Sequence, residues 1–302
     1  MMLKLGEIIK INRKEMGYSQ EDLSNGVCAV ANLSRIENGK SLPSRATFEA
    51  LMEKMGLSAG AYMSIFTDQD KLAFELKHEF NELFARSEYK EAEKILNELE
   101  VTPGQDKVYE RFIMMARILI KQVNGIDPKE ILKEHEKALP IFMADFSPSK
   151  IKKSLLTKLE INMLHAYALA NHAAGNPDMA IEILYELIAY VESKVYDKEG
   201  ISTMYTKLLS SISSYVGLSG DNIEALRLCE MGIKSCIKYN RYKYFPYLLY
   251  NKGYGLISTG NVDEGHKCIR QSYYIMSALG DTHNKMLQYI MAYAKEMNIE
   301  LL

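Results

Sequence analysis

Two stretches, Tyr18-Ser-Gln-Glu-Asp-Leu-Ser24 and Ala29-Val-Ala-Asn-Leu-Ser-Arg-Ile-Glu37, decide the fold of the N-terminal region. In the first stretch, Ser19 is followed three residues later by Asp22, a variant of the capping box that begins a helix. We predict a short helix over 20–24 that ends at Asn25-Gly26. After a tight turn, a second helix over 29–37 ends at Asn38-Gly39.

Apolar residues at helical spacing flank this pair of helices on both sides. Residues 3–16 predict a helix that Gly17 stops, and Ser44 caps another helix that Gly56 closes. Four short helices, the second and third joined by a tight turn, form the arrangement that lays one helix in the major groove of DNA. Any small helical bundle is the alternative. The candidate core residues are Leu5, Ile8, Ile9, Met16, Val30, Leu33, Ile36, Phe48, Leu51, Met52 and Met55.

The amino-acid sequence of this region also resembles that of a known family. Tyr18-Ser-Gln-Glu-Asp-Leu, Leu33-Ser-Arg-Ile-Glu-Asn-Gly-Lys and Leu42-Pro-Ser resemble the Xre (Cro/C1-type) helix-turn-helix family. The resemblance implies a lambda-repressor-like DNA-binding domain over 1–67, in which Gln20 contacts the DNA backbone and the early exposed residues of 29–37 face base edges. Arg35 has a structural alternative, pairing with Glu37 or Glu21. The candidate DNA-binding residues are Ser19, Gln20, Ala29, Ala31, Asn32, Ser34, Arg35 and Lys40.

The candidate base-reading helix departs from the family's polar pattern. Ala29, Val30 and Ala31 present methyl groups, which can pack on thymine but cannot form bidentate hydrogen bonds, so Asn32 is the one good candidate for reading adenine. Residues 1–66 carry eight basic and seven acidic residues. So small an excess predicts weak DNA binding by a monomer, because phosphate neutralisation supplies much of the binding energy. A homodimer that occupies the two half-sites of a palindromic operator would bind DNA more tightly than the monomer.

The rest of the chain repeats one turn motif. In four copies a small residue stands five positions after the turn, and Gly125-Ile-Asp-Pro-Lys-Glu130 is a weaker member. The starts are 38 to 50 residues apart, as in helical-hairpin repeats. In three copies, a second small residue stands twelve positions before the small residue that follows the turn. These residues are Ala168, Ser213 and Gly253, as expected where two helices cross closely. The four copies are Ser87-Glu-Tyr-Lys-Glu-Ala92, Gly175-Asn-Pro-Asp-Met-Ala180, Gly220-Asp-Asn-Ile-Glu-Ala225 and Gly260-Asn-Val-Asp-Glu-Gly265.

This pattern resembles the tetratricopeptide repeat in degenerate form, which implies an all-α chain with a right-handed superhelix of hairpins over 68–302. In this register the concave face carries Asn, His, Ser and Tyr, which can hydrogen-bond a peptide backbone and stack on its side chains. A solvated or self-packed polar face is the alternative. The candidate peptide-binding residues are Arg86, Asn162, His165, Lys207, Ser210, Tyr247, Tyr250, Asn251 and Tyr254.

An Xre domain before such repeats resembles the RRNPP family of peptide-sensing regulators of Gram-positive bacteria, of the PlcR type, over nearly the whole chain. The best local matches are Ser24-Asn-Gly-Val-Cys28, Leu33-Ser-Arg-Ile-Glu-Asn-Gly39, Tyr89-Lys-Glu91 and Tyr250-Asn-Lys-Gly253. The resemblance implies a dimeric transcription regulator controlled by a short quorum-sensing peptide, with Asn162 and Asn251 as backbone-holding amides. Some members carry several basic residues after the first hairpin turn, and here only Arg86 is charged, which leaves the peptide's charge open.

Other classes of function find little support in the sequence. We expect no enzyme and no cofactor, because the chain has no nucleophile elbow, phosphate-binding glycine loop or His-Glu-x-x-His motif. We expect no metal, since the four cysteines form no Cys-x-x-Cys pair and His165 and His172 alone are too few ligands. No apolar run suits a membrane span or signal peptide, which favours the cytoplasm. Two alternatives stay open: repeats that hold a protein partner, and repeats that serve only dimerisation.

Overall fold

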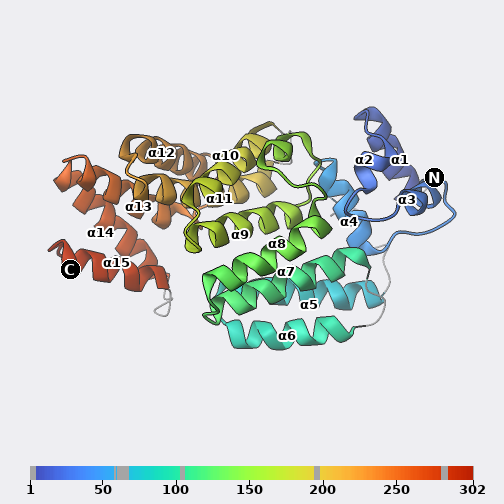
Figure 1. The fold of residues 1–302 in the computed structure, drawn as a ribbon, viewed down its shortest axis with the longest axis horizontal. Helices are drawn as coiled ribbons and strands as arrows, with labels where there is room; N and C mark the ends of the chain where they lie inside the picture. The colour runs from blue at the N-terminus through green and yellow to red at the C-terminus, as the bar shows by residue number, and fades with distance from the viewer. Residues whose placement is uncertain are drawn as a thin grey trace. The chain divides into compact units, whose positions relative to one another are not determined.

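The computed structural model describes residues 5–57, 59, 68–102, 106–193, 198–279 and 285–301, and every regular element in these ranges is a helix (Figure 1). The chain divides into two compact units, Met1–Ala174 and Gly175–Leu302. The first holds the N-terminal helices and the first hairpins. The expected boundary at residues 67 and 68 borders a segment outside the described residues, so it stays a prediction.

Four short helices form the N-terminal head: α1 (Leu5–Glu15), α2 (Gln20–Ser24), α3 (Val30–Glu37) and α4 (Arg45–Lys54). Ser19 and Asp22 form both hydrogen bonds of the expected capping box, and the Ser44 side chain caps α4. Helix α3 begins one residue later than expected, with Ala29 as its N-cap. The pair of helices joined by a turn is therefore confirmed.

The core of the head lies where α1, α3 and α4 meet. Ile9, Leu33, Phe48 and Leu51 are fully buried there. Helix α1 approaches α3 so closely at Gly6 that a Cβ on this residue would lie 1.9 Å from the carbonyl oxygen of Ile36. Only glycine fits between these two backbones.

Two core predictions were wrong, because Met16 is 39% exposed and Val30 is 43% exposed. Met16 follows the last residue of α1 and so lies beyond its packed face. Val30 is the first residue of α3, and a helical side chain points back toward the N-terminus, where α3 has no preceding turn to cover it. Val27, in the turn before α3, is the buried valine instead.

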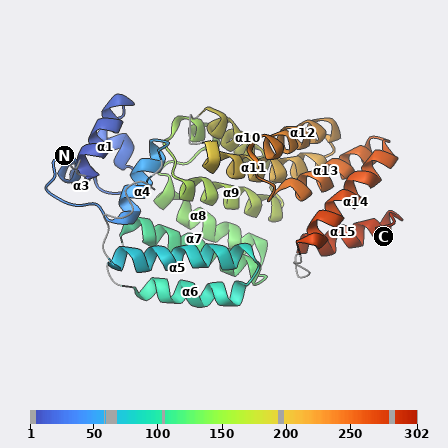
Figure 2. The ribbon, with the colours of Figure 1, turned by 180° about the vertical axis from the view of Figure 1, so that it is seen from behind.

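Helical hairpins follow the head in the first unit: α5 (Asp68–Ala85) with α6 (Tyr89–Val101), and α7 (Lys107–Val123) with α8 (Pro128–Phe142). Figures 1 and 2 show these four helices side by side. A 3-10 helix, η2 (Pro148–Lys153), leads into α9 (Lys158–Ala173). The expected small residue Ala92 is fully buried in α6.

The second unit contains α10 (Pro177–Ser193), α11 (Lys198–Leu218), α12 (Asn222–Tyr239), α13 (Phe245–Ser258), α14 (Val262–Ala278) and α15 (Lys285–Glu296). Helices α13 and α14 cross at small residues, as expected. A Cβ on Gly253 would lie 2.9 Å from the Gly265 carbonyl oxygen, and a Cβ on Gly265 would lie 2.9 Å from that of Gly253.

The repeating turns share one backbone conformation. All five starts have positive φ, a region in which glycine is favoured and other residues are uncommon. Four starts are glycines and the fifth is a serine. The repeat prediction is thereby confirmed at the level of the backbone. The φ angles are 64° at Ser87, 83° at Gly125, 94° at Gly175, 98° at Gly220 and 90° at Gly260.

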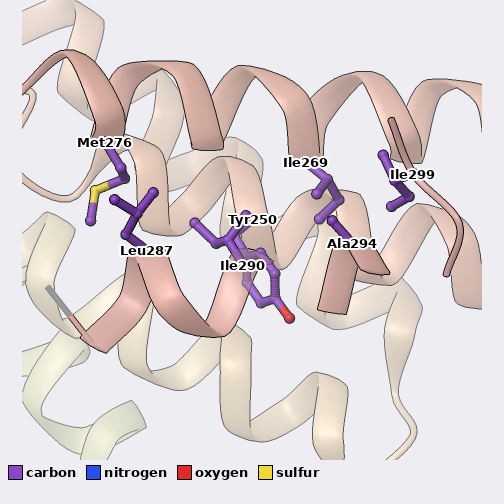
Figure 3. Packing of buried hydrophobic residues seen from close by; sticks show 7 residues of the cluster. All are labelled: Tyr250, Ile269, Met276, Leu287, Ile290, Ala294 and Ile299. Atoms are coloured by element: carbon purple, nitrogen blue, oxygen red, sulfur yellow. The ribbon is translucent and has the colours of Figure 1, made fainter. Parts of the chain in front are cut away.

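Helix α15 closes the second unit. Leu287, Ile290 and Ala294 of α15 pack on Ile269 and Met276 of α14 and on Tyr250 of α13, with Ile299 at the end of the cluster (Figure 3). Helix α15 thereby covers an apolar face of α13 and α14. No helix in the described ranges is long and apolar enough to cross a membrane.

Candidate functional site

The candidate DNA-binding residues lie at the start of α2, along α3 and, for Lys40, just after the end of α3. Gln20 and Ser34 are half-buried, and the other six are exposed. Asn32 and Arg35, the two polar side chains of α3 with the reach to contact base edges, are both exposed. The exposed residues are Ser19, Ala29, Ala31, Asn32, Arg35 and Lys40.

Two of these candidates are also used inside the head. The Gln20 side-chain nitrogen donates to Glu37 Oε2 over 2.7 Å. The Ser19 hydroxyl donates to Asp22 Oδ2 over 2.6 Å and accepts from the Asp22 N–H over 3.0 Å. Both side chains therefore help to hold the start of α2 in place. Any contact that they make with a DNA phosphate would add to these internal hydrogen bonds.

A buried ion pair, which the sequence did not reveal, joins α1 to α3. Arg13 donates from Nε to Glu37 Oε1 over 2.6 Å and from a guanidinium nitrogen to Glu37 Oε2 over 2.9 Å. Burial alone would raise the pKa of Glu37, but hydrogen bonds from Arg13 and Gln20 lower it. Glu37 thus pairs with Arg13, and this leaves Arg35 on the exposed side of α3.

The turn between α2 and α3 is held by residues of the first hairpins. Arg111 of α7 donates to the Gly26 carbonyl oxygen and, over 2.9 and 2.8 Å, to the carbonyl oxygens of Ile141 and Phe142. The same guanidinium lies 3.2 Å from Glu160 Oε1 at the start of α9. A Cβ on Gly26, whose φ is +71°, would lie 2.6 Å from that carboxylate oxygen.

Two further interactions hold this region: one joins the head to α7, and the other lies within the head. Asp106, the N-cap of α7, accepts from the Thr47 hydroxyl over 2.7 Å and from the Ser44 hydroxyl. Lys54 of α4 donates to the Asn25 carbonyl oxygen, and burial lowers the pKa of this lysine. Within the first unit, the position of α3 therefore depends on side chains of α7 and α9.

A pocket of about 270 Å³ lies in the second unit between α11, α13 and α15. Five of the nine candidate peptide-binding residues line it: Ser210, Tyr247, Tyr250, Asn251 and Tyr254. Ser211, Ser213 and Ser214 add further hydroxyl groups from α11. Met286 and Tyr289 of α15 complete the wall, and sequence reasoning missed them because α15 lies outside the repeat register.

Two side chains of α13 define the polar chemistry of the pocket. The Asn251 side-chain nitrogen donates to the Ser210 carbonyl oxygen and to Ser213 Oγ, over 2.9 Å each. The hydroxyl of Tyr250 is buried and has no hydrogen-bond partner among the described residues. The pocket therefore combines aromatic walls with a few polar groups, the usual composition of a ligand site.

The other candidate peptide-binding residues do not line this pocket. Lys207 is half-buried on α11, one turn before Ser210, and burial together with Lys243 lowers its pKa to about 8. Arg86, Asn162 and His165 belong to the first compact unit. His165 is buried, Asn162 is half-buried, and Arg86 is exposed with its guanidinium 3.9 Å from Glu82. Their role with a peptide stays a prediction.

The described residues contain no cluster of three or more His, Cys, Asp or Glu side chains that could hold a metal ion. All four cysteines are free, and three of them are buried.

Comparison with known proteins decides the fold. The family described as Helix-turn-helix matches residues 9–61. Bacillus thuringiensis PlcR, solved in complex with the peptide PapR7 and DNA, is similar with a TM-score of 0.59 and 18% identity, over 97% of this chain and 98% of that one. The chain has the PlcR fold. Apo PlcR agrees, with a TM-score of 0.60 and 17% identity over 96% and 98% of the two chains.

ComR is a second solved protein with a similar fold. ComR from S. thermophilus, solved in complex with DNA and its signalling peptide ComS, has a TM-score of 0.55 and 17% identity over 95% of this chain and 97% of that one. No curated protein sequence matches the chain. The predicted fold, an N-terminal helix-turn-helix domain followed by helical hairpins, is confirmed.

Proposed function

We propose that this protein is a DNA-binding transcription regulator whose promoter binding is controlled by a short signalling peptide. One observation carries the proposal: a single chain combines an exposed α3 in a helix-turn-helix head with an aromatic and hydroxyl-lined pocket in its hairpins. Proteins of the same fold have been solved with both DNA and a peptide bound. The function is recognition of DNA and peptide, without a catalytic step.

In this proposal Asn32 and Arg35 read base edges from α3, and Lys40 and the start of α2 contact the backbone. The peptide occupies the pocket of the second unit. Two copies of the chain form a homodimer on a palindromic operator, because one head with a charge excess near +1 neutralises few phosphates. A protein that binds a promoter and its signalling peptide in this way acts in the cytoplasm.

The first test is of the DNA-binding face. Duplexes enriched from a random library by the full-length chain are titrated by fluorescence anisotropy with wild type, Asn32→Ala and Arg35→Ala. Lys137→Ala is the control, since Lys137 is an exposed cation on α8, outside the head.

We expect each α3 variant to weaken binding to the enriched duplex about 5- to 150-fold, the effect of losing one good base contact, and the control to bind as wild type. Wild-type affinity for every duplex in both α3 variants would contradict the proposed DNA-binding face. A chain whose repeats only dimerise would bind the enriched DNA equally with and without any peptide.

A further inference from the structure

The pocket between α11, α13 and α15 has a distinctive charge pattern. Every residue that lines it is uncharged: the walls are serines, tyrosines, one asparagine, one glycine, one leucine and one methionine. A carboxylate or ammonium group buried here would find no partner of opposite charge among the lining residues. Removing an unpaired charge from water costs several kcal/mol or more, so the pocket selects against charged groups.

The Tyr250 hydroxyl is a hydrogen-bond donor without an acceptor. The residue is 6% exposed, and its ring lies between those of Tyr289 and Tyr293, each 5.7 Å away by ring centroids. Figure 3 shows its oxygen pointing away from the α14 side of the cluster. Burial, and then the neighbouring tyrosines, raise the pKa of this phenol, so it keeps its proton. The Tyr289 side chain is close, but its hydroxyl does not meet the geometry of a hydrogen bond with Tyr250.

Asn251 supplies a hydrogen-bond acceptor next to the Tyr250 donor. Because the Ser210 carbonyl oxygen can only accept, the atom that faces it must be the side-chain nitrogen, which fixes the orientation of this amide. The second hydrogen bond, to Ser213 Oγ, comes from the same nitrogen. Asn251 therefore has its oxygen Oδ1, an acceptor, left to offer to the pocket.

A neutral donor and a neutral acceptor on adjacent residues match the two polar groups of a peptide unit. At about 270 Å³ the pocket is near the lower end of the roughly 300–1,000 Å³ of small-molecule sites. It is therefore sized for one part of a peptide, while tyrosine rings offer stacking surfaces to an aromatic or aliphatic side chain.

We propose, on the basis of the function put forward above, that this pocket takes an uncharged, apolar or aromatic segment of the signalling peptide, and that Tyr250 is its specificity-determining residue. The Tyr250 hydroxyl donates to a carbonyl oxygen of the peptide backbone, and Asn251 Oδ1 accepts from a peptide N–H. The tyrosines of α13 and α15 cover the neighbouring apolar side chain.

The test uses the full-length chain and three sets of synthetic heptapeptides with free termini. The first set contains only uncharged residues with at least one aromatic or aliphatic pair. The second and third sets are the same peptides with one Glu or one Lys in that pair. Retention on the protein is measured by gel filtration and mass spectrometry, and the best retained peptide is titrated against wild type, Tyr250→Phe and the control Tyr274→Phe. Tyr274 is an exposed tyrosine of α14.

We expect the uncharged set to be retained at least tenfold over both charged sets. Tyr250→Phe should weaken the best peptide about 3- to 10-fold, as for one neutral hydrogen bond, without lowering the thermal stability of the free protein. Tyr274→Phe should bind as wild type.

Three results would overturn the inference while the proposed function stands: equal retention of a charged set, wild-type peptide affinity in Tyr250→Phe, or a lower unfolding temperature for that variant, since a hydroxyl with a structural partner would behave so. Retention of no set at all would overturn the inference and the peptide-sensing function together.

Discussion

The guanidinium of Arg13 on α1 and the carboxylate of Glu37 at the end of α3 form a bidentate, buried ion pair, with contacts of 2.6 and 2.9 Å. Arg13 also donates to the Tyr18 carbonyl oxygen over 2.7 Å, and Gln20 adds a third hydrogen bond to the carboxylate. One carboxylate therefore ties together α1, the start of α2 and the candidate recognition helix α3.

Arg13→Met should lower the free energy of unfolding by about 3–5 kcal/mol, because it leaves Glu37 buried without its counter-charge. Lys14→Met is the matched control on the same helix, where the lysine is exposed, and it should change stability by about 0.5 kcal/mol or less. Denaturant unfolding of the full chain measures both. Equal stabilities of the two variants would mean that the ion pair does not hold α1 to α3.

A second prediction concerns Arg111, which contacts Gly26 in the turn before α3 and Glu160 at the start of α9. Arg111→Ala should destabilise the protein by about 3–5 kcal/mol, since the buried Glu160 carboxylate and three carbonyl groups lose their partner. Arg117→Ala, on the same helix, removes an exposed pair with Glu100 and should cost about 1 kcal/mol or less. Thermal unfolding compares the two, and a cost for Arg117→Ala as large as that for Arg111→Ala would count against a buried junction.

These long-range pairs show where sequence reasoning stopped. Ser19, Ser44 and the turn glycines act on backbone groups a few residues away, so the helices and repeats could be predicted from local pattern. The register of small residues also put Tyr250 on the expected concave face with Asn251 beside it, and both residues line the pocket. Arg13 and Glu37 are 24 residues apart, and no local signal distinguishes their pairing from that of Arg35 with Glu37.

Other parts of the site could not be predicted for the same reason. Tyr289 reaches the pocket from α15, which lies after the last repeat, so no repeat register applies to it. The sequence identified Asn251 but not its orientation, because that depends on the Ser210 carbonyl oxygen of another helix.

The buried imidazole of His135 on α8 should make stability depend on pH. It is fully buried beside Tyr167, neither ring nitrogen has a hydrogen-bond partner among the described residues, and burial lowers its pKa to about 4. The unfolded chain binds this proton near pH 6.5 and the folded chain near pH 4. The stability that neutral His135 provides is therefore complete above pH 6.5 and is lost as the pH falls from 6.5 to 4.

His135→Phe should remove this part of the acid sensitivity, a difference of about 3 kcal/mol between pH 7 and pH 4 relative to wild type. His78→Phe serves as the control because the His78 side chain is largely exposed. Denaturant unfolding at the two pH values measures the difference. An unchanged pH dependence in His135→Phe would show that the imidazole is not held neutral by burial.

Close approach of two backbones leads to a further prediction. Gly6→Ala would place a Cβ 1.9 Å from the Ile36 carbonyl oxygen, so α1 and α3 must move apart, and we expect a loss of about 3 kcal/mol or more in the head. Gly217→Ala would place its Cβ at an ordinary 3.5 Å from Ala225, and it should be neutral or stabilising by up to about 1 kcal/mol. Unfolding temperatures of the two variants distinguish these effects, and a tolerated Gly6→Ala would contradict the packing of α1 on α3.

The measurement that tests the central claim most directly is fluorescence-anisotropy titration of the full-length chain on its enriched duplex, with and without a saturating amount of the best retained peptide. We expect the peptide to change the DNA dissociation constant about 5- to 150-fold, a coupling of about 1–3 kcal/mol, and the duplex to change peptide affinity by the same factor. A DNA dissociation constant that is the same with and without bound peptide would contradict peptide-controlled regulation.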